Sequence, residues 1–353
     1  MHDPITSLIT KLSTEHRLSA EGYAQLLTTE DPAVQDALIT AAVAVRKAQF
    51  GNGIFLRGLI ELTNYCKNNC YYCGIRRDNK DVMRYRMSHQ AVLDCCQMGA
   101  ELGFRTFVLQ GGEDPYWNDA RLCALITDIK ARFPQCAVTV SLGERSEESY
   151  RALRDAGADR YLLRHETADS QHYAMLHPPE MSLANRMRCL RTLKSLGYQT
   201  GCGMMVGSPY QTIEHLVKDL QWIEALQPEM VGIGPFLPHH ATPFAAFPAG
   251  SAAMTLRLLS IVRLMLPTVL LPATTALGTL LPDGLEQGIL AGANVIMPNL
   301  TPNTERCNYQ LYDGKCTAAK DTLSVLRDRT LRFAAIGYET VHQRGDAPSF
   351  LKP

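Results

Sequence analysis

The sequence carries no excess of charge of either sign. Lys and Arg together number 35 and so do Asp and Glu, which gives a formal net charge of zero. A balanced charge offers no general attraction to a phosphate backbone or an anionic membrane, so nucleic-acid binding is disfavoured. Low-complexity tracts and charge blocks are absent, while hydrophobic residues make up 46% of the chain. We therefore expect a folded protein with a sizeable core.

Targeting signals and membrane spans are also missing from the sequence. The first ten residues, MHDPITSLIT, lack the basic stretch, apolar core and cleavage site of a secretory signal. A long uncharged run at 264–282 contains Pro267, Pro272 and Gly278. We interpret it as a buried strand that ends in a polar turn, not as a membrane helix. These features predict a cytoplasmic protein that does not bind membranes.

Cysteine, in contrast, is plentiful. The chain has 11 cysteines, an odd number, and at 353 residues it is too long to need disulfides for stability. Without an export signal, this composition favours a reducing compartment and thiolate chemistry over a disulfide framework.

The hydrophobic pattern predicts an alternation of strands and helices. Residues 1–50 show helical periodicity. Eight short apolar runs then read as strands, at 54–62, 104–110, 137–142, 159–164, 200–206, 229–234, 268–273 and 293–298. Amphipathic stretches between them read as helices, for example at 89–102, 119–132, 146–156, 183–196 and 212–226.

Eight strand–helix units favour a complete (β/α)8 barrel of the TIM type, with an open doubly wound sheet as the alternative. We expect three regions: an N-terminal helical extension at 1–50, the barrel at 51–318, and a C-terminal tail at 319–353. The apolar spacing of Leu323, Val325, Leu326 and Leu331 predicts that this tail forms a helix that closes the barrel.

Three closely spaced cysteines follow the first predicted strand. Cys66, Cys70 and Cys73 form a C-x3-C-x2-C pattern, and thiolates bind both zinc and iron–sulfur clusters. Structural zinc needs a fourth ligand, and the adjacent Cys95 and Cys96 have poor geometry for joint chelation. In a cubane cluster, three cysteines leave one iron open to a small molecule. The pattern therefore favours a reactive cluster, with zinc and a remote fourth ligand, or unrelated thiols, as the alternatives.

The cysteine pattern resembles the signature of the radical S-adenosylmethionine (SAM) superfamily. Gln110, Gly111, Gly112 and Glu113 follow the second predicted strand and match the glycine-rich motif of that superfamily. The resemblance implies one 4Fe–4S cluster, whose open iron binds SAM and whose electron cleaves SAM to a 5′-deoxyadenosyl radical. The chemistry belongs to the cofactor, while the protein positions it.

The same resemblance implies further SAM contacts. Glu166 is expected to accept hydrogen bonds from the ribose hydroxyls or the amino group of SAM, and Tyr72 to pack near the adenine. Arg186 is expected to pair with the methionine carboxylate, with Arg164 as the competing candidate. Either arginine could instead make a structural ion pair, with Asp159 or Glu166.

Longer motifs resemble the HydE family of FeFe-hydrogenase maturases. They are found at 71–79, 85–87, 109–116, 160–168, 230–236, 272–276, 293–299 and 309–312, and the match covers roughly residues 50–318. Biotin synthase and the methylornithine synthase of pyrrolysine biosynthesis are the close relatives. The extra cysteines of biotin synthase are not found on these strands, and the paired threonines and the 309–312 segment favour HydE over methylornithine synthase.

HydE resemblance implies a role in building the two-iron subcluster of the hydrogenase. The expected substrate is a cysteine-bound iron carbonyl cyanide complex, and the expected partners are maturases of the HydG and HydF types and an external electron donor. His165 is expected to orient its neighbours. The residues expected to bind substrate are Ser141, Arg164, Thr274, Thr275, Tyr309 and Tyr312.

Some HydE proteins carry a second cluster on a C-terminal cysteine trio. This chain has Cys307 and Cys316 but no cysteine after them, so we expect no second cluster. Three other functions remain open: a radical SAM amino-acid mutase or biosynthetic enzyme, a non-catalytic carrier of an iron–organometallic fragment, and a zinc-stabilised barrel that binds a metabolite.

Overall fold

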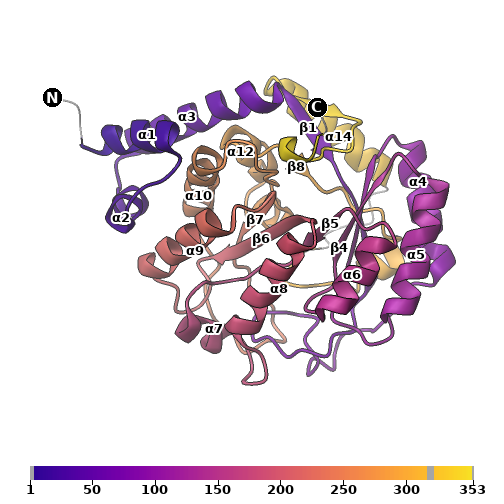
Figure 1. The fold of residues 1–353 in the computed structure, drawn as a ribbon. Coiled ribbons are helices and arrows are strands. Elements are labelled where there is room, and N and C mark those ends of the chain that lie inside the picture. Colours follow the sequence, from indigo (N-terminus) through magenta and orange to yellow (C-terminus); the bar gives the residue numbers. More distant parts are fainter. Residues whose placement is uncertain (1–3, 316–321, 352–353) are drawn as a thin grey trace.

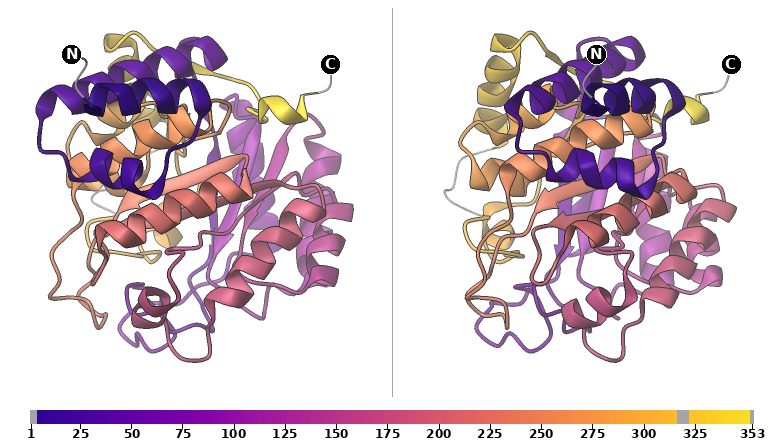
Figure 2. Two further views of the ribbon diagram at one scale, coloured as in Figure 1. Left: turned by 60° about the vertical axis from the view of Figure 1, so that its left-hand side comes forward. Right: turned by 90° about the vertical axis from the view of Figure 1, so that its left-hand side faces the viewer.

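Three helices precede the first strand. The computed structural model describes residues 4–315 and 322–351, and in it these helices are α1 (Pro4–Glu15), α2 (Ala20–Thr28) and α3 (Pro32–Phe50). Asp31 caps α3 by accepting a hydrogen bond from the Ala33 amide, and Pro32 fills its first turn. Figure 2 shows the three helices lying against the barrel helices α9 and α10.

Six parallel strands form the main sheet, in the order of their appearance in the chain. They are β2 (Gly58–Thr63), β3 (Thr106–Gly111), β4 (Ala137–Ser141), β5 (Arg160–Leu162), β6 (Gln199–Val206) and β7 (Met230–Pro235). Every residue of β2, β6 and β7 is buried. Parallel strands are covered on both faces, which explains why they appear in the sequence as continuous apolar runs.

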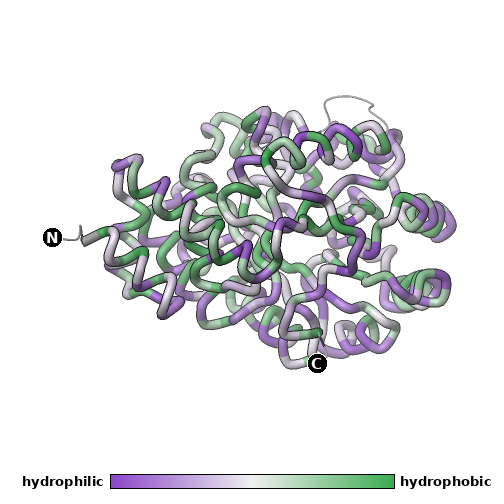
Figure 3. Tube along the Cα trace, turned by 90° about the horizontal axis from the view of Figure 1, so that it is seen from above, coloured by the Kyte–Doolittle hydropathy of each residue, from purple (hydrophilic) through white to green (hydrophobic). Residues whose placement is uncertain are grey.

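Helices connect the strands and cover the outside of the sheet (Figure 1). They are α4 (His89–Glu101), α5 (Asp119–Arg132), α6 (Glu147–Asp155), α7 (Ser170–Leu176), α8 (Leu183–Ser195), α9 (Ile213–Leu226), α10 (Ala252–Met265), α11 (Thr275–Leu280), α12 (Gly284–Leu290) and α13 (Asn303–Arg306). On α9 the buried Leu216, Leu220 and Ile223 recur every three or four residues. Figure 3 shows hydrophobic and hydrophilic residues alternating along the helices. The predicted helices at 89–102, 119–132, 146–156, 183–196 and 212–226 are confirmed to within about one residue at each end.

The first predicted strand is in fact two strands. Its backbone pairings change at Arg57: β1 (Gly53–Leu56) pairs with β8 (Val295–Ile296), whereas β2 pairs with β3. The predicted helical tail was also incomplete. After α14 (Thr322–Ala335) the chain forms β9 (Glu339–Val341), which pairs with β1, and a short 3-10 turn at Pro348–Phe350.

Closure of the barrel depends on isolated contacts and not on a continuous ladder. The predicted strand at 268–273 forms only single parallel bridges, from Leu270 to Met230 and from Pro272 to Val295. A further bridge joins Leu59 of β2 to Asn299, just after β8. The fold is thus a TIM-type α/β barrel whose last quarter is held by bridges, and the strand expected at 268–273 is reduced to an extended segment.

The carboxyl ends of the strands meet at one rim, where α/β barrels build their active sites. In Figure 1 this rim is the lower edge of the barrel, where the long loop between β2 and α4 also lies. Among the described residues, the longest apolar helices are too short or too polar to cross a bilayer.

Candidate active site

A cavity of about 300 Å³ opens at this rim. It brings together the three cysteines of the pattern and nearly all of the other residues singled out from the sequence. From that set, its walls contain Cys66, Cys70, Tyr72, Cys73, Gln110, Gly111, Gly112, Glu113, Ser141, Arg164, Glu166, Arg186, Thr274, Tyr309 and Tyr312. Thr275 is the exception, because it lines a different pocket, next to Asn299 and Lys315.

The three cysteines lie on the loop after β2 as free, partly exposed thiols. Burial raises the pKa of Cys73 to about 12, and it also raises the pKa of Cys66 and of Cys70. Among the described residues, the group of three possible ligands within 4.8 Å of one another is His239, His240 and Asp313, not the cysteines.

The kind and number of donors bear on the choice between a single ion and a cluster. Structural zinc takes four ligands, and the pattern supplies three. The donor set is all sulfur, which suits iron–sulfur clusters. The residues present therefore fit a multi-iron cluster better than a single zinc.

Arg84 holds this loop in shape. Its guanidinium donates to the carbonyls of Ile75 (2.9 Å), Arg76 (2.6 Å) and Asn79 (3.0 Å), and also to that of Asn64. These carbonyls come from both sides of the cysteine pattern. A single cation thus closes the loop around the place where the cysteines converge.

Gly112 allows the glycine-rich strand end to approach the cysteine loop. A Cβ at Gly112 would lie 2.2 Å from the Tyr65 carbonyl and 2.7 Å from the Cys66 Cβ, so any other residue would push the loop away. The neighbouring Glu113 amide lies 3.4 Å from the Cys66 sulfur, and its carboxylate pairs with Lys67 at 3.2 Å. Close backbone approach of this kind is what the glycines of the motif provide.

Tyr72 is fixed by a histidine that the sequence reasoning missed. Its hydroxyl lies 3.1 Å from Nε2 of His177, whose Nδ1 lies 3.0 Å from the Tyr173 carbonyl. Burial lowers the pKa of His177 to about 3, with Arg186 adding to the effect, so the ring is neutral. The neutral ring donates to the carbonyl and accepts from Tyr72, which keeps that tyrosine on the cavity wall.

Two arginine–carboxylate pairs flank the cavity. Arg186 donates to Glu144 at 2.6 Å and to the Arg164 carbonyl at 2.5 Å. Arg164 lies 3.3 Å from Glu166 and donates to the Met204 carbonyl at 2.5 Å. Arg186 therefore already has a carboxylate partner, one other than the Asp159 and Glu166 considered from the sequence.

His165 supports the unusual backbone of Glu166. Glu166 has a φ of +67°, a conformation that residues other than glycine rarely adopt. The buried His165 ring accepts a hydrogen bond from the Gly203 amide at 3.3 Å, and its Nε2 lies 3.3 Å from the buried Asp219. Asp219 also accepts from the Ala168 amide at 2.5 Å. This network is consistent with the orienting role expected for His165.

At the opposite wall, Thr274 has a buried hydroxyl without a hydrogen-bond partner. Tyr309 is buried and accepts a long hydrogen bond from Gln110 (3.4 Å). Burial raises the pKa of Tyr312 to about 12, although hydrogen bonds with Thr275 and Thr279 oppose the shift. Thr275 thus lies beside Tyr312, and its expected contact with substrate stays a prediction.

The hydrogen bonds of His239, His240 and Asp313 do not favour metal binding by this group. His240 Nδ1 lies 2.8 Å from Asp313, as in an ordinary ion pair. His239 Nδ1 accepts from the Ala241 amide at 3.1 Å, so the proton of the neutral ring sits on Nε2 and blocks the atom that would bind the ion. Cys316, considered above for a second cluster, lies outside the described residues.

Arg84 and His177 are the site residues that the sequence did not reveal. Neither belongs to a short motif with a recognisable spacing, and each reaches the site from a different loop or helix end. Arg84 directly precedes the 85–87 motif, which was the one available signal.

Comparison with known proteins identifies the family. The model of the radical SAM superfamily matches residues 60–223. The HydE subunit of the FeFe-hydrogenase maturase from Thermotoga maritima is 45% identical over 302 residues, which are 85% of this chain and 86% of that protein. This chain belongs to the HydE family of radical SAM proteins. It is accordingly a radical SAM enzyme, and the cofactors of this superfamily are a 4Fe–4S cluster and SAM.

Further comparisons concern methylornithine synthase and, for the fold alone, HydG. The 3-methylornithine synthase of Methanosarcina acetivorans is 30% identical and covers 86% of this chain and 85% of its own length. A crystal structure of methylornithine synthase aligns with a TM-score of 0.83 at 28% identity, over 95% of this chain and 97% of that one. The HydG maturase shares the fold, with a TM-score of 0.79 at 20% identity over 96% of this chain and 76% of that one.

Proposed function

We propose that this HydE-type maturase acts in assembly of the two-iron subcluster of FeFe-hydrogenase, on a cysteine-bound iron carbonyl cyanide precursor. The observation that carries the proposal is one cavity with the cysteine pattern in one wall and the unpartnered Thr274 hydroxyl in another. The Thermotoga relative supports it by name. Partner maturases of the HydG and HydF types would supply the precursor and receive the product.

Each group of residues has a distinct task in this proposal. Cys66, Cys70 and Cys73 would hold three irons of the cluster and leave the fourth for SAM. Bound together, the cluster and SAM supply a 5′-deoxyadenosyl radical. The backbone at Gly111 and Gly112, which lies close to the cysteine loop, would bind the amino group of SAM.

The arginine pairs set the charge of the cavity. Arg164 and Arg186 lie beside it, and each has a carboxylate neighbour. An anionic substrate carboxylate would be bound by Arg164, whose side chain is 33% exposed and whose Nε is unpartnered. An apolar part of the cavity wall, formed by Met205, Phe236 and Leu237, would exclude water from the reacting centre.

The test is anaerobic iron–sulfur reconstitution followed by reduction in the presence of SAM. We expect about four irons per chain and formation of 5′-deoxyadenosine. Cys70→Ala is expected to abolish both, whereas Cys123→Ala, at a partly buried cysteine of α5 remote from the pattern, retains both. If the Cys70→Ala variant still matures the hydrogenase, the result would favour the carrier function and contradict the proposal.

A second function is favoured by the likeness to methylornithine synthase, at a TM-score of 0.83. In that case the same cavity would bind an amino acid. Supplying the reconstituted enzyme with amino acids or with the cysteine-bound iron complex separates the two functions. Consumption of an amino acid in place of the complex would reject the maturase substrate while leaving the radical SAM assignment intact.

A further inference from the structure

A surface beside the cysteine loop combines exposed tyrosines with exposed arginines. Tyr65 and Tyr116 are each 37% exposed. The Arg86 guanidinium carbon lies 4.0 Å from the ring centre of Tyr65 and 5.1 Å from that of Tyr116, and Arg121 lies 4.1 Å from the same Tyr116 ring. We call Tyr65, Arg86, Tyr116 and Arg121 the Tyr–Arg ladder. Cation–π contacts of this kind hold the side chains in a fixed arrangement.

The ladder presents positive charge to solvent because its counter-ions lie beneath it. Arg86 is 37% exposed at its side chain, whereas its partner Asp114 is fully buried. Lys67 nearby is 56% exposed, and its partner Glu113 is 10% exposed. An approaching molecule therefore meets the cations before the carboxylates, and a negatively charged surface is attracted.

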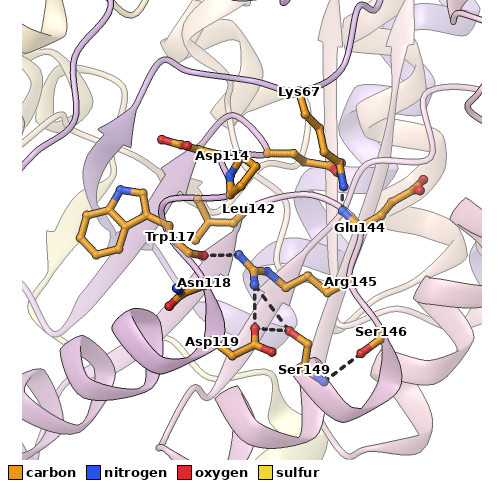
Figure 4. A pocket seen from close by; sticks show the side chains of 12 residues that line it. Lys67, Asp114, Trp117, Asn118, Asp119, Leu142, Glu144, Arg145, Ser146 and Ser149 are labelled. Carbon is orange, nitrogen blue, oxygen red and sulfur yellow. Dashed lines mark hydrogen bonds and ion pairs between the residues drawn. The ribbon is translucent and has the colours of Figure 1, made fainter.

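A groove of about 330 Å³ adjoins the ladder. Figure 4 shows Lys67 and Asp114 on one side of it and Asp119 and Arg145 on the other. The carboxylates that line this groove are each paired with a cation, for example Asp119 with Arg145 at 2.8 Å and Glu144 with Arg186 at 2.6 Å. The groove thus adds a concave surface next to the Tyr–Arg ladder, and its paired carboxylates do not neutralise the exposed arginines.

The ladder also lies next to the expected cluster. Tyr65 is the residue before Cys66, and its carbonyl faces Gly112 of the glycine-rich strand end. Tyrosine and arginine are enriched at the centres of protein interfaces. Exposed aromatic and cationic groups one peptide bond from a predicted cluster ligand are a combination that suits a redox partner.

We propose that the Tyr–Arg ladder, with Lys67, is the docking surface for an acidic protein that carries single electrons. The proposal rests on the cluster chemistry of the function proposed above, for which it names the class of electron donor. In the docked complex the reduced carrier loses one electron and the cluster gains it, with no proton or group transferred. Opposite charges on the two proteins speed their association, and complexes that transfer electrons have small interfaces.

The test measures reduction of the reconstituted enzyme by stopped-flow bleaching of its cluster absorbance, without SAM. The donors are dithionite, a small molecule, and an acidic flavodoxin in its reduced form. We expect Arg121→Glu to slow reduction by flavodoxin about tenfold at low ionic strength, and the difference to shrink in about 0.5 M salt. Tyr116→Ala should slow it less. Reduction by dithionite should not change.

Arg132→Glu is the matched control, because Arg132 is exposed at the opposite end of the same helix, α5. Equal slowing by Arg121→Glu and Arg132→Glu, or none by Arg121→Glu, would overturn the docking surface. So would an Arg121→Glu enzyme that is reduced normally but fails in maturation, because the ladder would then belong to another partner. Absence of a reducible cluster from the unaltered enzyme would instead overturn the proposed function.

Discussion

Thr274 and Thr275 are neighbours in the chain, but their hydroxyls face different surroundings. Thr274 lies on the wall of the cavity with a buried hydroxyl that has no partner, and Thr275 lines another pocket and contacts Tyr312. A buried hydroxyl without a partner costs stability. The position of Thr274 is therefore best explained by a hydrogen bond to a bound molecule.

Thr274→Val tests this explanation. Valine has the same shape, and since no protein hydrogen bond is lost, stability should stay equal or rise by up to about 1 kcal/mol. Substrate affinity should fall about tenfold, while SAM cleavage without substrate stays unchanged. Thr275→Val is the control and should change affinity less than about threefold. Thermal unfolding and substrate titration measure the two effects, and unchanged affinity of Thr274→Val would contradict the assignment.

Arg84 offers a second test at this scale. Arg84→Gln removes most of four hydrogen bonds to loop carbonyls, and we expect a loss of about 3 kcal/mol in the free energy of unfolding. The reconstituted cluster should also be lost faster to an iron chelator. Arg77→Gln, at a side chain that is 52% exposed, should behave as the unaltered enzyme. Chelation rates that are equal in the two variants would show that Arg84 does not hold the loop.

Among the elements, the segment after β9 contacts the sheet through one buried carboxylate. Asp346 accepts from Arg160 (2.6 Å), Gln199 (2.7 Å) and Arg344 (2.8 Å), and it thereby joins the chain end to the amino ends of β5 and β6. Burial opposes ionisation, but these donors outweigh it and lower the pKa of Asp346 to about 2. The carboxylate is thus the form that the folded state stabilises.

The lowered pKa of Asp346 makes the stability of the folded protein depend on pH. Because the folded-state pKa lies below the unfolded value of about 3.9, the stabilisation is complete above pH 4 and is lost as the pH falls toward 2. We expect Asp346→Asn to be less stable by about 2 kcal/mol at pH 6, and the gap to narrow by about 1 kcal/mol at pH 3. Urea unfolding at both values measures it. A gap that does not depend on pH would show that the charge of Asp346 is not the cause.

For the molecule as a whole, the question is how the barrel closes between β7 and β8, where strand pairing is reduced to single bridges. The buried Asn294 side chain accepts from the Leu271 amide (2.8 Å) and from Arg263 (3.1 Å), and so adds to the backbone hydrogen bonds that join the segment 271–273 to β8. Removing the Asn294 side chain leaves the buried Leu271 amide and one N–H group of Arg263 without this acceptor.

We expect Asn294→Ala to lower the free energy of unfolding by about 3 kcal/mol and to speed amide exchange at 269–273 and β8 more than at β3 or β4. Gln287→Ala, on the exposed side of α12, is the control. Hydrogen exchange followed by mass spectrometry reports both. Uniform exchange across all strands would mean that closure does not depend on this residue.

The order and type of most elements were determined by the sequence, since apolar runs and amphipathic stretches report burial directly. The cysteine pattern and the glycine-rich strand end could also be recognised from the sequence, because each motif spans only a few consecutive residues. What only the tertiary structure decided were contacts between distant segments: the split at Arg57, the pairing of β9, the loop clamp by Arg84 and the separation of Thr274 from Thr275. Strand pairing and hydrogen-bond partners depend on which segments meet in space, and no local pattern encodes that.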